Sequence, residues 1–216
     1  MEIIRGRNTS VTDASAIAER LHGYDTIQID IGTGDGRYVQ HVAQTCPTSF
    51  VIGIDACREN LHEVSRRAPT NAMFVIANAL MLPAELCGLA AHVTINFPWG
   101  SLLEGLIIDD PALLDGLVMI ARPNAGIEVR LNGGALAEVG WSLEAGAERV
   151  RAVLAANGFK MQPLRSLSVH ELSSCPTTWA KRLAFGRDPR AMYLRGSRKG
   201  NKAATTEFAM GVANLA

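Results

Sequence analysis

Apolar, β-branched runs alternate with helix-like stretches along this chain, and this alternation constrains its fold more than any other feature. The runs predicted as strands occupy residues 25–31, 50–55, 72–77, 92–97, 126–131, 159–170 and 191–195. The stretches predicted as helices occupy residues 38–45, 59–67, 111–121 and 144–157. Strands at this spacing, connected by crossover helices, form a parallel, doubly wound sheet. We therefore expect a Rossmann-like α/β fold with a seven-stranded sheet, whose ligands bind at the carboxyl ends of the strands.

The length of the chain indicates a single domain. Its 216 residues and mass of 23.2 kDa suit one hydrophobic core. We expect this domain to span residues 1–197, with an N-terminal extension at 1–9. Insertions between the predicted elements, each able to contact a substrate, fall at residues 99–110, 132–142 and 173–189. Small residues without strong periodicity fill positions 201–216, so we expect a flexible tail over 198–216.

Composition excludes several other classes of protein. With 48% hydrophobic and 19% charged residues, the chain is too apolar for disorder. Its apolar runs fall short of the roughly 18–20 residues that a membrane span needs, and its first residues do not resemble a signal peptide. The four cysteines have neither a disulfide framework nor metal-ligand spacing. We expect a cytoplasmic protein with reduced thiols, no metal and no membrane contact.

The net charge of zero conceals an uneven distribution of charge. From residue 173 onward eight basic residues face only two acidic ones, a balance of +6, while residues 1–172 carry −6. Clustered Lys and Arg side chains are what a protein needs to contact the phosphates of a nucleic acid. A solubilising basic tail is the alternative, and charge alone does not separate the two.

A glycine-rich loop follows the first predicted strand of the doubly wound sheet, with the sequence DIGTGDG at residues 30–36. A dinucleotide fingerprint needs its third glycine at position 37, which is Arg37, so the spacing is G-x-G-x-G preceded by an acid. This loop resembles motif I of S-adenosylmethionine (SAM) methyltransferases, in which the acid recognises the methionine amino group. Asp55 ends the next strand, where a carboxylate can accept both ribose hydroxyls. Together these features favour a nucleoside cofactor bound by Asp30, Gly32, Gly34 and Asp55.

The third strand leads into Asn78, Ala79 and Leu80, without the acid that many SAM enzymes place there. We expect Asn78, or main-chain groups at Ala79 and Leu80, to contact the adenine ring instead. A simple cap of the strand end is an equally good interpretation of Asn78. Asn96, at the end of the fourth strand, is a further candidate for the cofactor site.

Two tryptophans occur in contexts that suggest a nucleobase site. Trp99 follows the fourth strand within Pro-Trp-Gly, at the expected mouth of the pocket, and Trp179 begins the basic segment. Trp141 has no charged cluster beside it and is interpreted as packing. An enzyme that modifies a base must flip it out at a cost of a few kcal/mol, and aromatic stacking returns about 1–3 kcal/mol per base. Two indole rings facing each other across a purine-width gap could therefore hold the flipped base, although core packing is the alternative for each.

These motifs resemble those of the aminoglycoside-resistance 16S rRNA (adenine-1408, N1) methyltransferases of the Kam/Npm type. The resemblance covers residues 1–197 and is carried by IDIGTGDGR (29–37), GID (53–55), FPWGSLLE (97–104) and WAKRLAFGR (179–187). It implies a class I methyltransferase fold and transfer of a methyl group from SAM to N1 of one adenine in the decoding site of the 30S subunit, giving aminoglycoside resistance. The last two motifs are the more selective.

The resemblance also implies roles for individual residues. Trp99 and Trp179 match the aromatic pair that sandwiches the flipped adenine, and Ser101 and Thr177 match hydroxyls that line the cofactor pocket. The segment expected to grip rRNA contains Lys181, Arg182, Arg187 and Arg190. Glu138, in the insertion at 132–142, is a weaker candidate for contact with the substrate.

Methylation of adenine N1 needs no general base, because this nitrogen carries an in-plane lone pair. The chain accordingly offers no paired catalytic carboxylates, and its five histidines are scattered. The alternatives are another SAM-dependent RNA methyltransferase, such as a tRNA guanine-N7 enzyme, a small-molecule methyltransferase and a non-catalytic RNA-binding protein. We expect a monomer.

Overall fold

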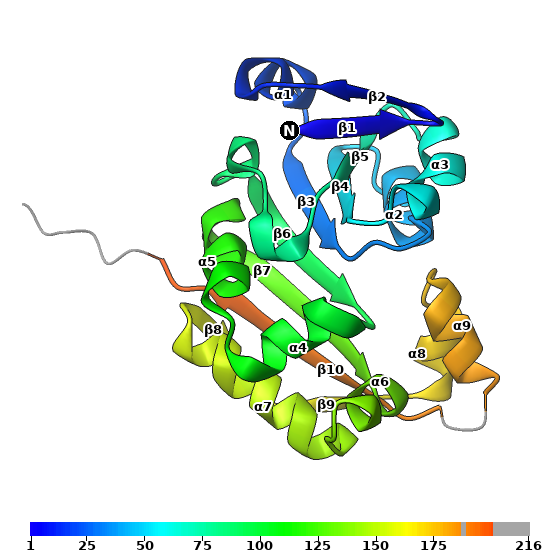
Figure 1. Ribbon diagram of the computed structural model, residues 1–216, viewed down its shortest axis with the longest axis vertical. Helices are drawn as coiled ribbons and strands as arrows, with labels where there is room; N and C mark the ends of the chain where they lie inside the picture. The colour runs from blue at the N-terminus through cyan, green and yellow to red at the C-terminus, as the bar shows by residue number, and fades with distance from the viewer. Residues whose placement is uncertain (187–188, 201–216) are drawn as a thin grey trace, which may run out of the picture.

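The computed structural model describes residues 1–186 and 189–200, and within them ten strands form one sheet (Figure 1). The strands are β1 (Glu2–Arg5), β2 (Asn8–Val11), β3 (Thr26–Ile31), β4 (Ser49–Asp55), β5 (Ala72–Ile76), β6 (Ala90–Asn96), β7 (Ala121–Asn132), β8 (Phe159–Met161), β9 (Arg165–Leu167) and β10 (Ala191–Arg198). Their spatial order is β2-β1-β5-β4-β3-β6-β7-β10-β8, and β9 also pairs with β10.

The centre of the sheet is parallel, as expected. Strands β5, β4, β3, β6 and β7 run in the same direction. The residues of β4 and β5 are almost all buried, because both faces of these strands are covered, and β-branched and aromatic side chains suit such a pleated surface. Because parallel strands end at the same edge, this topology brings the ends of β3, β4 and β6 together.

The sheet differs from the expected seven parallel strands at three places. The N-terminal extension forms the antiparallel hairpin β1–β2, which pairs with β5. The predicted strand at 159–170 is instead two short strands, β8 and β9, because Pro163 lies between them and has no backbone N–H to donate to a ladder. The last strand, β10, runs antiparallel to β7. The Rossmann-like class I fold is confirmed with these additions.

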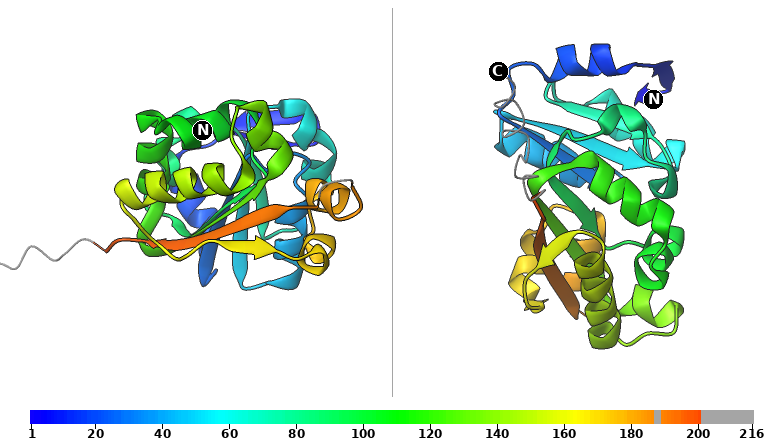
Figure 2. Two further views of the ribbon diagram at one scale, coloured as in Figure 1. Left: turned by 90° about the horizontal axis from the view of Figure 1, so that it is seen from below. Right: turned by 90° about the vertical axis from the view of Figure 1, so that its left-hand side faces the viewer.

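Helices cover both faces of the sheet (Figure 2). They are α1 (Ala14–Leu21), α2 (Arg37–Thr45), α3 (Arg58–Arg66), α4 (Gly100–Ile108), α5 (Pro111–Ile120), α6 (Gly133–Glu138), α7 (Leu143–Ala156), α8 (Val169–Ser174) and α9 (Thr178–Ala184), with short 3₁₀ helices η1 (Ala79–Met81) and η2 (Ala84–Leu86). The larger core joins the sheet to α1, α4, α5 and α7, while α2 and α3 pack on the opposite face. No helix in the described part of the chain is long and apolar enough to cross a membrane.

The last insertion folds into two short helices, α8 and α9. Ser168 and Glu171 form a capping box at the start of α8, and the Thr177 hydroxyl accepts a hydrogen bond from the Ala180 N–H at the start of α9 (2.9 Å). Leu172 and Ala180 pack with Phe97 and Ala191 in a small separate core. This core holds α9 against the end of β6, which places Trp179 near Trp99.

Candidate functional site

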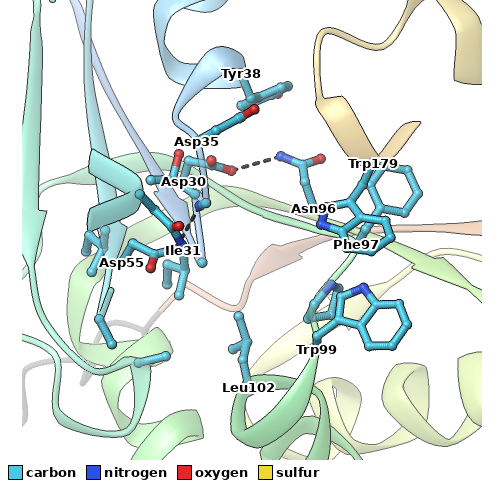
Figure 3. Close-up of a pocket in the computed structure, with 18 of the residues that line it drawn as sticks. Asp30, Ile31, Asp35, Tyr38, Asp55, Asn96, Phe97, Trp99, Leu102 and Trp179 are labelled. Carbon is cyan, nitrogen blue, oxygen red and sulfur yellow. Dashed lines mark hydrogen bonds between the residues drawn. The ribbon is translucent and has the colours of Figure 1, made fainter. Parts of the chain in front are cut away.

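A cavity of about 540 Å³ opens at the carboxyl ends of the central strands (Figure 3). It is bordered by the glycine loop after β3, the end of β4, the segments after β5 and β6, and the start of α9. The predicted cofactor and base contacts that line it are Asp30, Gly32, Gly34, Asp55, Asn78, Ala79, Asn96, Trp99, Ser101, Thr177 and Trp179. The fold therefore gathers residues from distant places in the sequence around one space.

The glycine loop turns tightly so that its backbone faces the cavity. The Gly32 and Thr33 N–H groups both donate to the Ile54 carbonyl, at 2.9 Å each. Gly32 has φ +68°, and a Cβ there would lie 2.7 Å from a methyl carbon of Leu102, so position 32 accepts only glycine without rearrangement. Gly34 has φ +55° and nothing within 4 Å of the Cβ position, which leaves room for a ligand against its backbone.

Asp30 is the most deeply placed acid of the site, with only 2% of its surface exposed. Its Oδ1 accepts hydrogen bonds from the Thr94 hydroxyl (2.6 Å) and the Asn96 amide (2.8 Å). Burial raises the pKa of Asp30 from 3.8 to about 6, so the carboxylate is mostly ionised at neutral pH. A buried anion of this kind suits a cationic partner such as an ammonium group.

Asp55 is fixed by two backbone N–H groups. Its Oδ2 accepts from Gly34 (2.7 Å) and its Oδ1 from Cys57 (2.9 Å). Each carboxylate oxygen has a second lone pair, so Asp55 can still accept the hydroxyls of a ribose. The bond to Gly34 also couples the position of this acid to the glycine loop.

The adenine end of the expected cofactor site is only partly as predicted. Asn78 lines the cavity, and its Oδ1 accepts the Leu80 N–H at the start of η1 (2.9 Å). The capping interpretation of Asn78 is therefore confirmed without excluding a ligand contact. Leu80 does not line the cavity, because its side chain packs against the larger core.

An unusual backbone turn directs Trp99 toward the cavity. Phe97 is a bulky residue at φ +53°, a conformation that such residues rarely adopt. Its side chain is 2% exposed within the small core, and its N–H donates to the Arg130 carbonyl (2.8 Å). These contacts hold the strained turn, which lets Pro98 and Trp99 leave the sheet at the mouth of the site.

The two tryptophans stack directly on each other. The ring centroids of Trp99 and Trp179 are 5.2 Å apart and their planes differ by 30°. The prediction that the two indoles face each other is confirmed, but the predicted purine-width gap is absent in this structure. A base between them needs about 7 Å, two layers of van der Waals contact, and here each ring occupies the stacking surface of the other. Trp99 packs partly against the core, whereas Trp179 is 41% exposed on a short helix.

Two of the four predicted rRNA-binding residues lie on the helix that carries the exposed tryptophan. Lys181 and Arg182 are on α9, and the Arg182 guanidinium lies 5.3 Å from the Trp179 ring centroid. Arg190 is exposed just before β10. Arg187 lies outside the described residues, as do positions 201–216 of the predicted tail.

Among the other residues that line the cavity, Tyr38 and Thr178 have no signal in the sequence. Tyr38, on α2, lines the cavity, and burial raises the pKa of its hydroxyl to about 12, so it stays neutral. The Thr178 hydroxyl donates to Asp35 at 2.5 Å, which joins α9 to the glycine loop. Residues 143 positions apart in the chain give no local pattern from which this contact could be inferred.

The chemistry of the cavity fits a nucleoside cofactor that carries an amino-acid end. Two acids of different burial, a glycine backbone open to the cavity and a nearby amide provide partners for an ammonium group and for ribose hydroxyls. Within residues 1–186 and 189–200 there is no group of three or more His, Cys, Asp or Glu side chains that could hold a metal ion.

This sheet topology, with a glycine loop after the central strand and acids ending two adjacent strands, defines the class I SAM-dependent methyltransferases. Comparison with known proteins narrows the class. The family model NpmA, described as 16S rRNA (adenine(1408)-N(1))-methyltransferase, matches residues 2–198, and the chain belongs to this family.

Individual relatives agree with the family. A 16S rRNA (adenine(1408)-N(1))-methyltransferase of Escherichia coli is 32% identical over 208 residues, covering 87% of this chain and 94% of the relative. The crystal structure of the 16S rRNA methyltransferase KamB superposes with a TM-score of 0.83 at 27% identity, covering 92% of this chain and all of KamB. A mutant 16S rRNA (adenine(1408)-N(1))-methyltransferase from Catenulisporales acidiphilia, solved with cosubstrate SAM, shares the fold with a TM-score of 0.83 at 24% identity, covering 94% of this chain and 98% of the mutant enzyme.

Proposed function

We propose that this protein transfers a methyl group from SAM to N1 of adenine-1408 of 16S rRNA, within the assembled 30S subunit, and thereby gives aminoglycoside resistance. The observation that carries the proposal is the stacked pair Trp99 and Trp179 at the mouth of a cavity that suits SAM. Membership of the family identifies the reaction, and the site provides a cavity for the cofactor and two aromatic rings for the base. A methylated N1 loses its hydrogen-bond acceptor and gains positive charge, both of which disfavour a polycationic drug.

The chain's own residues would hold the cofactor by its two polar ends. Asp30, kept in place by Thr94 and Asn96, would accept the ammonium of the methionine portion. Asp55 would accept hydrogen bonds from the ribose hydroxyls. Gly34, which has no side chain, leaves room for the ligand beside its backbone. Ser101 and Thr177 contribute hydroxyls to the wall of the same cavity.

Catalysis in this site depends on alignment and electrostatics more than on proton transfer. When bound, SAM supplies an electrophilic methyl group on its sulfonium. The adenine N1 lone pair needs no base to activate it, so the protein has only to orient the ring, exclude water and stabilise the developing cation. Indole faces stabilise a cation by roughly 0.5–2 kcal/mol, and Trp99 and Trp179 present two such faces.

Entry of the base requires the two tryptophans to separate. Trp179 is the ring expected to move, because it is exposed on the seven-residue helix α9, whereas Trp99 packs against the core. The stack that is lost on separation is replaced by two stacks on the base, which offset the few kcal/mol needed to flip it. The facing sides of the two rings thus stay stacked on each other until a base is available.

Substitution of Arg182 by alanine is expected to weaken binding to the 30S subunit without a matching loss of SAM affinity. Arg182 lies beside Trp179 at the edge of the cavity, where its guanidinium would contact the phosphates that flank the flipped base. The association constant falls as the salt concentration rises, and losing one phosphate contact makes the slope of its logarithm against the logarithm of salt concentration shallower by about 1. Binding to 30S subunits at several salt concentrations measures this slope. Arg151, paired with Glu148 on α7, is the matched control, and an equal slope change in Arg151→Ala contradicts the assignment.

The affinity for SAM is expected to fall in acid. Because burial places the pKa of Asp30 at about 6, the carboxylate is charged above that pH and becomes neutral below it. Only the charged form pairs with the ammonium of the ligand, so at pH 5 the dissociation constant should be about tenfold higher than at pH 7. Calorimetric titration with SAM at the two pH values tests this. A constant affinity across the range would remove Asp30 from the site.

The proposed reaction is tested by incubating the protein with labelled SAM and, separately, 30S subunits, free 16S rRNA and tRNA. We expect label in 30S subunits, with primer extension stopping at adenine-1408. Label in tRNA alone would indicate the tRNA guanine-N7 alternative. Binding of SAM without transfer to any RNA would favour a small-molecule substrate. Drug sensitivity of a susceptible bacterium expressing the protein tests the resistance phenotype.

A further inference from the structure

Arg130 lies next to the proposed cofactor site without lining its cavity. It projects from β7 at the position paired with Asn96 of β6, and Asn96 lies beside Asp30 of β3. The Arg130 Nη1 donates to the Asn96 Oδ1 at 2.6 Å, and the Asn96 Nδ2 donates to the Asp30 Oδ1 at 2.8 Å. Three neighbouring strands thus contribute one residue each to a continuous chain of hydrogen bonds.

The chemistry of the two outer residues allows only one orientation of the Asn96 amide. Arg130 can only donate hydrogen bonds, and an ionised Asp30 can only accept them. The amide oxygen of Asn96 must therefore face Arg130, and its NH₂ group must face Asp30. Without Arg130, the amide oxygen has no fixed donor on that side, and the side chain is free to rotate away from Asp30.

Arg130 is itself held firmly enough to set this orientation. Its Nη2 donates to the Glu128 Oε2 at 3.1 Å. The guanidinium carbon lies 5.8 Å from the Tyr38 ring centroid and 5.3 Å from that of Tyr193, so the cation is flanked by two aromatic rings. Although burial acts in the opposite direction, the neighbouring side chains of His92 and Tyr193 and the charge of Arg130 lower the pKa of Glu128 to about 2, which keeps this partner of Arg130 charged.

We infer that Arg130 is a positioning residue for the methionine end of the cofactor, acting through the amide of Asn96 on the carboxylate of Asp30. The inference rests on the proposed function, because it takes SAM as the ligand of Asp30. Arg130 does not line the cavity, and the two lining residues that it contacts, Asn96 and Tyr38, both lie near Asp30, so its effect should be confined to the end of the ligand that Asp30 binds. In the proposed mode of binding, Asp55 at the end of β4 would hold the ribose and the segment after β5 would hold the adenine, so neither should be affected by the substitution.

The test compares three ligands by calorimetry on the full chain: SAM, S-adenosylhomocysteine and 5′-methylthioadenosine, which lacks the amino-acid end. We expect Arg130→Met to weaken the binding of SAM and S-adenosylhomocysteine about tenfold and that of methylthioadenosine less than about twofold, by analogy with residues that orient the ligands of metal ions, whose loss costs about 10–100-fold in affinity. Arg130→Lys keeps the charge but offers a single ammonium in place of the planar fork, so it should recover part of the loss.

A double-mutant cycle separates this role from a merely structural one. If Arg130 acts through Asn96, then the variant that combines Asn96→Ala with Arg130→Met should bind SAM no more weakly than Asn96→Ala alone. Arg165→Met is the matched control, because Arg165 lies over the same Tyr193 ring (4.8 Å) but pairs with Glu171, so SAM affinity should not change. Thermal melting of each variant confirms that it is folded.

Three results would overturn the inference: an equal loss for all three ligands, additive losses in the double variant, or no loss in Arg130→Met. Failure of the proposed function has a different signature: the unsubstituted protein would either bind neither SAM nor S-adenosylhomocysteine, or bind SAM without transferring its methyl group to 30S subunits. The two failures are therefore distinguished by titrating the unsubstituted protein with SAM and by assaying its methyl transfer to 30S subunits.

Discussion

Replacing Trp99 or Trp179 with alanine is expected to reduce methylation of 16S rRNA by roughly 5- to 150-fold each, while the affinity for SAM stays nearly unchanged. This range corresponds to the roughly 1–3 kcal/mol that one aromatic face contributes to stacking on a base. Removing both indoles leaves no surface to hold the flipped adenine, so the double variant should fall below detection. Methyl transfer to 30S subunits and calorimetric titration with SAM measure the two quantities separately.

Phenylalanine at either position should restore most of the activity, because it keeps an aromatic face of smaller area. Trp141→Phe is the matched control, since this third tryptophan lies outside the cavity and packs against the core. If SAM affinity falls in parallel with methylation in both alanine variants, the two rings support the cofactor site and do not hold the base. Full activity after the loss of either indole would exclude the sandwich altogether.

Replacing Asp30 with asparagine is expected to weaken SAM binding roughly 10- to 150-fold while making the folded protein more stable. The loss corresponds to the roughly 1.5–3 kcal/mol of a charge-assisted hydrogen bond between carboxylate and ammonium. The gain in stability comes from removing a buried carboxylate that is costly to ionise in the folded protein. In the folded protein the pKa of Asp30 is about 6, whereas its ordinary pKa is 3.8. The contribution of Asp30 to the free energy of unfolding is therefore fully present below pH 3.8, where the carboxyl is protonated in both states, and is lost as the pH rises through 6 and the buried carboxyl ionises.

At pH 7 the ionised Asp30 therefore lowers the free energy of unfolding by up to about 3 kcal/mol, and replacing it with asparagine would remove this loss. Because the amide oxygen of the substituted side chain can still accept the bonds from Thr94 and Asn96, we expect the midpoint of thermal unfolding to rise by several degrees. Asp25→Asn is the control, since Asp25 is exposed and lies just before the start of β3, far from the end that carries Asp30. Unchanged SAM affinity in Asp30→Asn, or a lower melting temperature, would contradict this account.

The opposing effects at Asp30 indicate where this protein concentrates unfavourable features. An ionised carboxylate with 2% exposure and a phenylalanine at φ +53° both lie at the carboxyl ends of the central strands. Each is held by surrounding contacts, Asp30 by two donors and Phe97 by the small core that also contains Leu172 and Ala180. Strain and buried charge at one place are typical of a binding site that is organised before its ligand arrives.

Much of the architecture could be predicted from local patterns. The helices α2, α3, α5 and α7 and the parallel strands lie where periodicity places them, because side chains repeat with the geometry of each element. Asp30 and Asp55 lie at the ends of adjacent parallel strands, and such ends meet at one edge of a sheet, so their convergence on one cavity follows from strand order. The split of one predicted strand at Pro163 carries a local signal as well, in the missing N–H of proline.

The contacts that complete the site depend on packing between distant segments, and only the tertiary structure decided them. The stack of Trp99 on Trp179, the bond from Thr178 to Asp35 and the chain from Arg130 to Asp30 each join elements far apart in sequence. Propensity and periodicity report on neighbours within a few residues, whereas these distances are set by how α8, α9 and β7 pack against the ends of β3 and β6. Sequence alone therefore determined which chemical groups are available and on which edge, and the folded core determined which of them touch.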